Sequence, residues 1–175
     1  MYSLASEEND VNLRELSVGV KMAQNLLKNV YLFKNLGASE LELVSQAGEA
    51  QTFNIGDDIF CQADPSKALY VIRHGSVKIH QKSSSGDNIE VANLGTGSHF
   101  GEMAFVDSEP RSASATATEK SEIVVLDYNK LDEILTANPA IAVSFYKELA
   151  HFLCGRLRVT TNDLSFAREK NLSHF

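Results

Sequence analysis

"LYVIRHGSVKIH", residues 69–80, is the stretch that decides the fold, because it places two β-rich runs on either side of a glycine. Its branched and aromatic residues are typical of strands. A similar run, "SEIVVLDY", occupies residues 121–128. Between such runs lie turn-forming sequences at 54–57, 85–88 and 95–97. Several short strands separated by turns, with no helical period between them, predict an antiparallel β-sandwich or jelly roll.

Helices are predicted on both sides of this β region. Upstream, residues 10–48 show a loose helical stripe of apolar residues, formed by Leu13, Leu16, Val20, Leu27 and Val30. Within them, "GASELELVSQAG", residues 37–48, reads as a capping box with Ser39 as the N-cap, Glu42 three residues later and Gly48 closing the helix.

Downstream, Asp127 is expected to cap a short helix, and Asn138 with Pro139 to start a long one. Along the long helix an apolar stripe recurs at three- and four-residue steps, through Leu149, Leu153, Leu157, Thr160 and Leu164. A stripe of this length is expected to extend beyond the barrel and to face a second subunit. The predicted architecture is mainly β: a jelly roll with N-terminal helices and a long C-terminal helix. We divide it into a helical extension at 1–30, the domain at 31–165 and a tail at 166–175.

Composition narrows the possible functions of this chain of 175 residues. Its 23 acidic residues against 16 basic ones leave a net charge of −7, which argues against an unassisted nucleic-acid binder. Cys61 and Cys154 lie far apart without a partner motif, so a reducing, cytoplasmic location is expected. The acidic N-terminus has no apolar signal-peptide region, and no apolar run is long enough to span a membrane.

A metal-dependent jelly-roll enzyme is the first alternative, and it would need clustered histidines with a carboxylate. The five histidines, His74, His80, His99, His151 and His174, include no His-x-His pair, although His74 and His80 could face each other across a sheet. No nucleophile elbow, P-loop or carboxylate pair is visible either. We therefore expect no metal, no cofactor and no enzymatic activity.

"SHFGEMAFVDSEPRSASATA", residues 98–117, carries the candidate site. Gly101 lets the backbone approach a ligand, and the amides that follow it can surround an anion at the start of a short helical turn. Arg111 can add a forked cationic donor, and the small Ser112 and Ala113 leave room for a phosphate. Glu102 would repel that anion, so it is expected to accept hydrogen bonds from a neutral hydroxyl. An anion beside a hydroxyl describes a sugar phosphate; an ordinary ion pair between Glu102 and Arg111 on a loop is the other interpretation.

This segment resembles the phosphate-binding cassette of the cyclic nucleotide-binding domain family. The matching residues are Phe100-Gly101-Glu102, Met103-Ala104-Phe105 and Pro110-Arg111-Ser112-Ala113. "IFCQADPSKALYVIRHGSVKI", residues 59–79, is similar to the paired-strand signature of the family, and "LFKNLGASELELV", residues 32–44, is similar to its entry helices. The resemblance covers residues 31–165. Ala63 departs from it, since a glycine is usual at this position.

The resemblance implies a ligand and roles for particular residues. Arg111 would pair with the cyclic phosphate, Glu102 would accept the ribose 2′-hydroxyl, and amides near Gly101, Ala104 and Ser112 would complete the phosphate shell. The residues implied for the base and sugar wall are Ile79, Val91 and Ala92; their other interpretation is simple barrel core.

Residues 156–164, "RLRVTTNDL", look like the part of bacterial catabolite activators where hydroxyl residues from both subunits of a dimer meet the adenine amino group. This similarity implies adenine contacts from Thr160 and Thr161, a preference for cAMP and a homodimer formed through the long helix. Ser112 is compatible with cGMP as well.

Catabolite activators continue into a DNA-binding domain, whereas only "SFAREKNLSHF" follows here, so no direct contact with nucleic acid is expected. The expected function is that of a cAMP sensor that acts through its long helix on an unidentified protein. A cGMP sensor, or a ligand-free interaction protein of the same fold, is the alternative.

Overall fold

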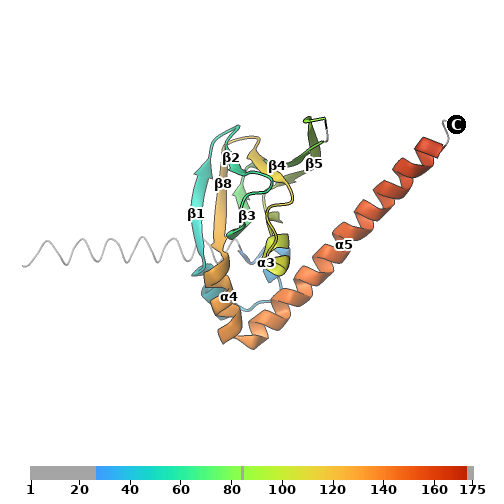
Figure 1. Cartoon of the computed structure of the whole chain (residues 1–175). Coiled ribbons are helices and arrows are strands. Elements are labelled where there is room, and N and C mark those ends of the chain that lie inside the picture. Colours follow the sequence, from blue (N-terminus) through green and yellow to red (C-terminus); the bar gives the residue numbers. More distant parts are fainter. Residues whose placement is uncertain (1–26, 84, 173–175) are drawn as a thin grey trace, which may run out of the picture.

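Eight strands form two four-stranded antiparallel sheets in the computed structural model, which describes residues 27–83 and 85–172 (Figure 1). The first sheet has the order β1-β8-β3-β6, with strands Gly48–Phe53, Ser121–Asp127, Ala68–His74 and His99–Phe100. The second has the order β2-β7-β4-β5, with strands Asp58–Phe60, Ser114–Ala117, Ser76–Lys82 and Asn88–Gly95. This arrangement confirms the predicted jelly roll.

The two strands of the opening stretch, β3 and β4, belong to different sheets. β3 pairs with β8, with Ile72 opposite Ile123, whereas β4 pairs with β5 and β7, with Ile79 opposite Ala92 and Ala115. Gly75 lies between the strands, so the chain passes there from one sheet to the other. The inward side chains of both sheets then meet in one apolar cluster inside the barrel.

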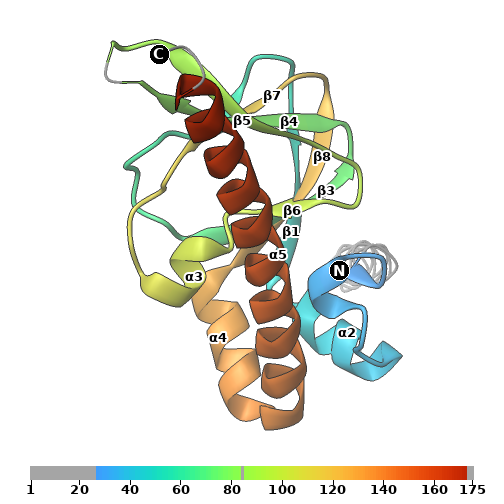
Figure 2. The same ribbon diagram turned by 90° about the vertical axis from the view of Figure 1, so that its right-hand side faces the viewer.

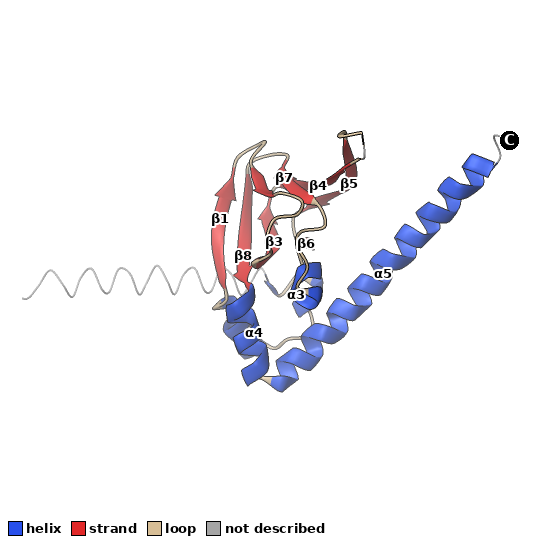
Figure 3. Cartoon of the chain, viewed as in Figure 1, coloured by secondary structure: helices blue, strands red, loops and turns tan. Residues whose placement is uncertain are grey.

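Helices cover the outer side of the first sheet at one end of the barrel (Figures 1 and 3). They are the 3₁₀ turn η1 (Tyr31–Phe33), α2 (Ala38–Ser45), α4 (Tyr128–Ala137) and the first part of α5 (Pro139–Leu172). A second apolar cluster holds them together, and in it Phe33 stacks on Phe145 with 5.7 Å between ring centres. Leu27 and Val30 are fully buried in this cluster; the remainder of the predicted N-terminal helical stripe, up to residue 26, lies outside the described residues.

The predicted N-cap of α4 is correct, whereas that of α2 is wrong. Asp127 does cap α4, because its carboxylate accepts the amide of Lys130 at 3.0 Å. At α2 the N-cap is Gly37, which has no side chain to complete a capping box; only its amide is bonded, to the Glu40 carboxylate at 2.7 Å. The expected cap, Ser39, is already inside the helix, since α2 begins at Ala38. The helix also ends earlier than predicted, at Ser45, because Gly48 opens strand β1.

Helix α5 begins at Pro139, as predicted, and extends for 34 residues. Asn138 has the predicted N-cap position, and its carbonyl accepts the Ala142 amide at 3.1 Å, but its side-chain amide donates backward to the Ile134 carbonyl at the end of α4. Figures 1 and 2 show α5 passing in front of the barrel and angling away from it. Leu149 is buried, whereas Leu157 and Leu164 are 66% and 50% exposed. The apolar stripe therefore extends beyond the barrel, and a second subunit facing it stays a prediction.

A buried carboxylate attaches the base of α5 to the N-terminal segment. Glu148 is 3% exposed, accepts the Asn35 side-chain amide at 2.6 Å and lies 2.8 Å from the Lys34 ammonium. This hydrogen-bonded ion pair keeps the pKa of Glu148 below its ordinary value. The first four turns of α5 are thus held by both apolar packing and a charge pair.

Candidate functional site

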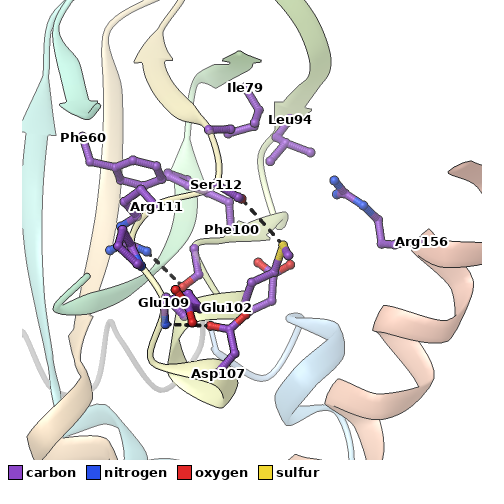
Figure 4. Close-up of a pocket in the computed structure, with 15 residues that line it drawn as sticks. Phe60, Ile79, Leu94, Phe100, Glu102, Asp107, Glu109, Arg111, Ser112 and Arg156 are labelled. Atoms are coloured by element: carbon purple, nitrogen blue, oxygen red, sulfur yellow. Dashed lines mark hydrogen bonds between the residues drawn. The ribbon is translucent and has the colours of Figure 1, made fainter. Parts of the chain in front are cut away.

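A pocket with about 650 Å³ of space, including its open mouth, lies between the second sheet and the turn that follows β6 (Figure 4). Its lining combines apolar barrel residues with both charged residues of the predicted site, Glu102 and Arg111. Four parts of the chain meet there: Phe60 of β2, the strand pair β4 and β5, residues 100–113, and one side chain from α5.

Gly101 makes the turn from β6 into the short helix α3 (Met103–Asp107). Its φ of +76° lies in the left-handed region, which L side chains rarely adopt. A Cβ atom here would also come within 2.7 Å of Arg111 Nη1. A glycine is therefore required both by the backbone and by the close approach of the arginine.

Arg111 is buried, with only 5% of its surface exposed. Its Nη1 donates to the Gly101 carbonyl at 3.1 Å and its Nη2 to the Ala68 carbonyl at 2.7 Å, while the guanidinium carbon lies 4.2 Å from the centre of the Phe60 ring. Nε is buried and has no hydrogen-bond partner among the described residues. A buried cation bound to neutral oxygen atoms, with a donor to spare, is well suited to hold an anion.

The backbone of Arg111 is held by the loop between β2 and β3. The Arg111 amide donates to the Asp64 carbonyl at 2.9 Å, and the Arg111 carbonyl accepts the Ala63 amide at 2.8 Å. Ala63 has a φ of 70°, so this alanine adopts the left-handed conformation that a glycine adopts most easily. Although alanine stands here in place of the glycine that is usual in the family, the loop keeps its hydrogen bonds to the Arg111 backbone.

Glu102 is 6% exposed, and burial raises the pKa of its carboxyl group, an effect that Arg156 and Arg111 partly offset. The side-chain hydrogen bonds of Arg111 all run to neutral oxygens, and no ion pair between the two residues is found among the described parts of the chain. The alternative of an ordinary Glu102–Arg111 ion pair on a loop is therefore not what the structure contains.

The family model described as "Cyclic nucleotide-binding domain" matches residues 50–138, which contain this pocket apart from the α5 side chain. The chain belongs to the cyclic nucleotide-binding domain family. It is 32% identical to the Cyclic AMP receptor protein of Thermus thermophilus over 148 residues, which are 83% of this chain and 67% of that protein. It is also 29% identical over 119 residues to Cyclic GMP-binding protein C of Dictyostelium discoideum, covering 68% of this chain and 4% of that protein.

Solved structures agree with this assignment. The Catabolite Activator Protein of Thermus thermophilus superimposes with a TM-score of 0.69 at 32% identity, over 78% of this chain and 62% of that one. A cyclic nucleotide-binding domain from Methylobacillus flagellatus has the same fold, with a TM-score of 0.72 at 22% identity, over 82% of this chain and 81% of that one. The chain spans 61–67% of the length of the first curated relatives that it matches.

Eight of the predicted site residues line the pocket of this cyclic nucleotide-binding domain. They are Ile79, Gly101, Glu102, Met103, Ala104, Arg111, Ser112 and Ala113. The Ser112 hydroxyl points to the Met103 sulfur at 3.8 Å (Figure 4). This contact links helix α3 to the segment that carries Arg111.

The other four predicted residues lie outside this lining. On β5, Val91 is 49% exposed, and Ala92 packs against the inner apolar cluster. Thr160 and Thr161 are exposed on α5, and the Thr161 hydroxyl donates to the Leu157 carbonyl at 2.8 Å. Because α5 angles away from the barrel, the two threonines are not brought to the pocket within one chain. Their contacts with a base stay a prediction.

Arg156 is the basic residue of the pocket that was not predicted from the sequence. It projects from α5 toward the pocket, opposite Ile79 and Leu94 (Figure 4). A signal for it was available, because Arg156 precedes Thr160 by four residues and so shares its helix face. Phe60, Leu94, Phe100, Asp107, Glu109 and Pro110 complete the lining.

His99 connects the cassette to α5. Its ring lies 4.2 Å from that of Phe152, and only 5% of its surface is exposed. Burial, with a smaller contribution from Arg156, lowers the pKa of His99 to about 4. The histidine is therefore neutral near pH 7 and acts there as an aromatic packing residue.

In the described parts of the chain, no three His, Cys, Asp or Glu side chains are grouped so that they could hold a metal ion. Among the helices of the same residues, none is both long enough and apolar enough to cross a membrane.

Proposed function

We propose that this domain is a cAMP sensor whose pocket binds the cyclic phosphate at Arg111 and whose helix α5 transmits the signal. The observation that carries the proposal is the state of Arg111: a buried guanidinium 4.2 Å from the Phe60 ring centre, whose Nε has no hydrogen-bond partner in the described parts of the chain.

The chemistry of the pocket favours a cyclic nucleotide over a simple anion. A phosphodiester brings one negative charge, which matches the buried guanidinium of Arg111. The ribose of the nucleotide brings a hydroxyl, for which the nearby Glu102 is a suitable acceptor. The apolar side chains of Ile79 and Leu94 provide a surface on which a purine can pack.

The preference for cAMP is supported by two observations of different kinds. Several relatives carry cAMP in their names, including the receptor protein of Thermus thermophilus and a CRP-like cAMP-activated regulator of Mycobacterium tuberculosis, which is 27% identical. In addition, Thr160 and Thr161 supply neighbouring hydroxyl groups on α5. A cGMP sensor is the second candidate, because the Dictyostelium relative is named as a cGMP-binding protein.

For the signal, the proposed moving part is α5 beyond Leu153. Up to that residue the helix packs on the apolar cluster, and Phe152 and Arg156 are its links to the cassette. A ligand that contacts Arg156 and Glu102 can favour one position of the helix through its differential affinity. The exposed apolar residues further along, Leu157 and Leu164, are the proposed contact with a second copy.

Isothermal titration calorimetry with cAMP and cGMP tests the proposal. The wild type should bind cAMP more tightly than cGMP. Arg111→Ala should lower the affinity by about 2–5 kcal/mol, roughly 30-fold or more, because it leaves the bound anion without its partner. Arg73→Ala is the matched control, since Arg73 of β3 pairs with Glu122 of β8 and does not line the pocket. No binding of either nucleotide by the wild type would refute the proposed function.

Hydrogen exchange tests the proposed signal separately. Saturating cAMP should change the exchange of residues 140–165, where α5 meets the cassette and then leaves it. A ligand that binds without altering exchange in this range would remove α5 from the mechanism.

A further inference from the structure

Tyr128, the first residue of α4, makes a hydrogen-bonded bridge behind the phosphate-binding cassette. Its hydroxyl accepts a hydrogen bond from Arg111 Nη1 at 3.2 Å and donates one to the Gly101 carbonyl. Arg111 Nη1 also donates to the Gly101 carbonyl, at 3.1 Å. The phenol, the guanidinium and the turn carbonyl thus bond to one another in a closed triangle.

The tyrosine itself is firmly placed. Its ring centre is 5.2 Å from that of Phe105 in α3, and its amide donates to the Lys67 carbonyl at 2.9 Å. The next carbonyl, that of Ala68, accepts Arg111 Nη2. Tyr128 and the second acceptor of the arginine therefore belong to the same junction between β8, β3 and α4.

The phenol is suited to this double role because it keeps its proton. Burial raises the pKa of Tyr128 above its ordinary value, and the opposing effect of Arg111 is smaller. A neutral hydroxyl can accept from the guanidinium and donate to the carbonyl at the same time.

These contacts determine which part of the guanidinium is available to a ligand. The faces of the group lie near aromatic rings, with its carbon 4.2 Å from the Phe60 centre and 5.4 Å from the Tyr70 centre. Nη1 donates to Gly101 and Tyr128, and Nη2 donates one of its two hydrogens to Ala68, while Nε has no partner among the described residues. Of the three acceptors, only the Tyr128 hydroxyl belongs to a side chain and can be removed by substitution.

We infer that Tyr128 is a positioning residue, whose hydroxyl fixes the Arg111 guanidinium before the ligand arrives and so increases the affinity for a cyclic phosphodiester. This inference rests on the proposed function. Its physical basis is preorganisation: an arginine that is already ordered loses less conformational entropy when the anion binds.

Tyr128→Phe removes the hydroxyl and keeps the ring that packs on Phe105. The Kd for cAMP is expected to rise about 3- to 10-fold, the range of one lost hydrogen bond. Tyr146→Phe is the matched control: its ring also stacks near Phe105, with 6.3 Å between centres, but it is 43% exposed on α5. The control should bind cAMP as the wild type does.

A double-mutant cycle separates positioning from general support of the fold. In an Arg111→Ala background, Tyr128→Phe should cause no further loss of affinity, because its effect passes through the arginine. Full additivity of the two losses, or an unchanged Kd for Tyr128→Phe alone, would overturn the inference while leaving cAMP binding by the wild type intact.

A second readout needs no ligand. The ¹⁵Nε order parameter of Arg111 in the free protein should be high in the wild type and in Tyr146→Phe, and lower in Tyr128→Phe. An equally rigid Arg111 in Tyr128→Phe would refute the positioning role even if no nucleotide bound. Absence of cyclic-nucleotide binding by the wild type, with a rigid arginine that Tyr128→Phe loosens, would refute the proposed function and its affinity consequence while keeping the positioning role.

Discussion

Replacing Gly101 by alanine should damage both the fold and the site. The residue has a φ of +76°, and a left-handed alanine costs about 1–2 kcal/mol relative to glycine. The added Cβ would also lie 2.7 Å from Arg111 Nη1 and 3.2 Å from Tyr70 Cδ2. The Arg111 guanidinium then has to move away from the Gly101 carbonyl, at the cost of a charge-assisted hydrogen bond of about 1.5–3 kcal/mol. We expect a total loss of roughly 2.5–5 kcal/mol in the free energy of unfolding.

Gly97→Ala separates these two costs. Gly97 has a comparable φ of +84°, but nothing lies within 4 Å of the position that its Cβ would take. This control should lose only the backbone contribution, about 1–2 kcal/mol, and should keep its affinity for cAMP. Urea unfolding gives the stability of each variant, and calorimetry gives its affinity.

The outcome for Gly101→Ala depends on the arginine. If its stability and affinity equal those of Gly97→Ala, then Arg111 tolerates the Cβ without leaving its place. In that case the close packing of the Arg111 guanidinium against Gly101 would not determine the stability of the protein or its affinity for cAMP.

Three further predictions concern the links between the barrel and α5. The pKa of His99 in the folded protein, about 4, lies below its ordinary 6.5. The stability that neutral His99 contributes is therefore complete above pH 6.5 and is lost as the pH falls toward 4, by up to about 3 kcal/mol. Urea unfolding at a series of pH values should show this loss in the wild type and not in His99→Phe. Glu148→Gln should lower the midpoint of thermal unfolding because Lys34 loses its charged partner, and Lys34→Met should add little in that background; equal, additive losses would show that the pair is not coupled. Thr160→Val with Thr161→Val should weaken cAMP binding about tenfold and cGMP binding less, measured by competition calorimetry, whereas equal weakening would exclude an adenine contact.

Local patterns were sufficient to predict the strands, the cassette and the start of α5. Gly101, Glu102 and Arg111 lie within eleven residues of one another, so their meeting in one pocket follows from a turn and a short loop. The cap of α2 was misassigned because Ser39 and Gly37 both fit an N-cap, and the choice between them depends on where the chain enters the apolar cluster. The same limit applies to Asn138, whose side chain bonds backward to α4.

Contacts between distant segments could not be predicted from spacing. Arg156 reaches the pocket only because Pro139 and α4 set the direction of α5, and Tyr128 meets Arg111 only because β8 lies beside β3. The threonines show the converse. Their helical spacing is as expected, but in a single chain they are exposed on α5 and do not line the pocket.

The length of α5 turns small rotations at its base into large movements at its far end. With a rise of about 1.5 Å per residue, its 34 residues form a rod of about 50 Å. A tilt of one degree about the Pro139 end therefore displaces the other end by about 0.9 Å. A few degrees of rotation, small enough to leave Phe145 and Leu149 within their apolar cluster, would separate or join surfaces by several ångströms. In the proposed mechanism, small side-chain shifts at the barrel would therefore become larger backbone displacements at the far end of α5.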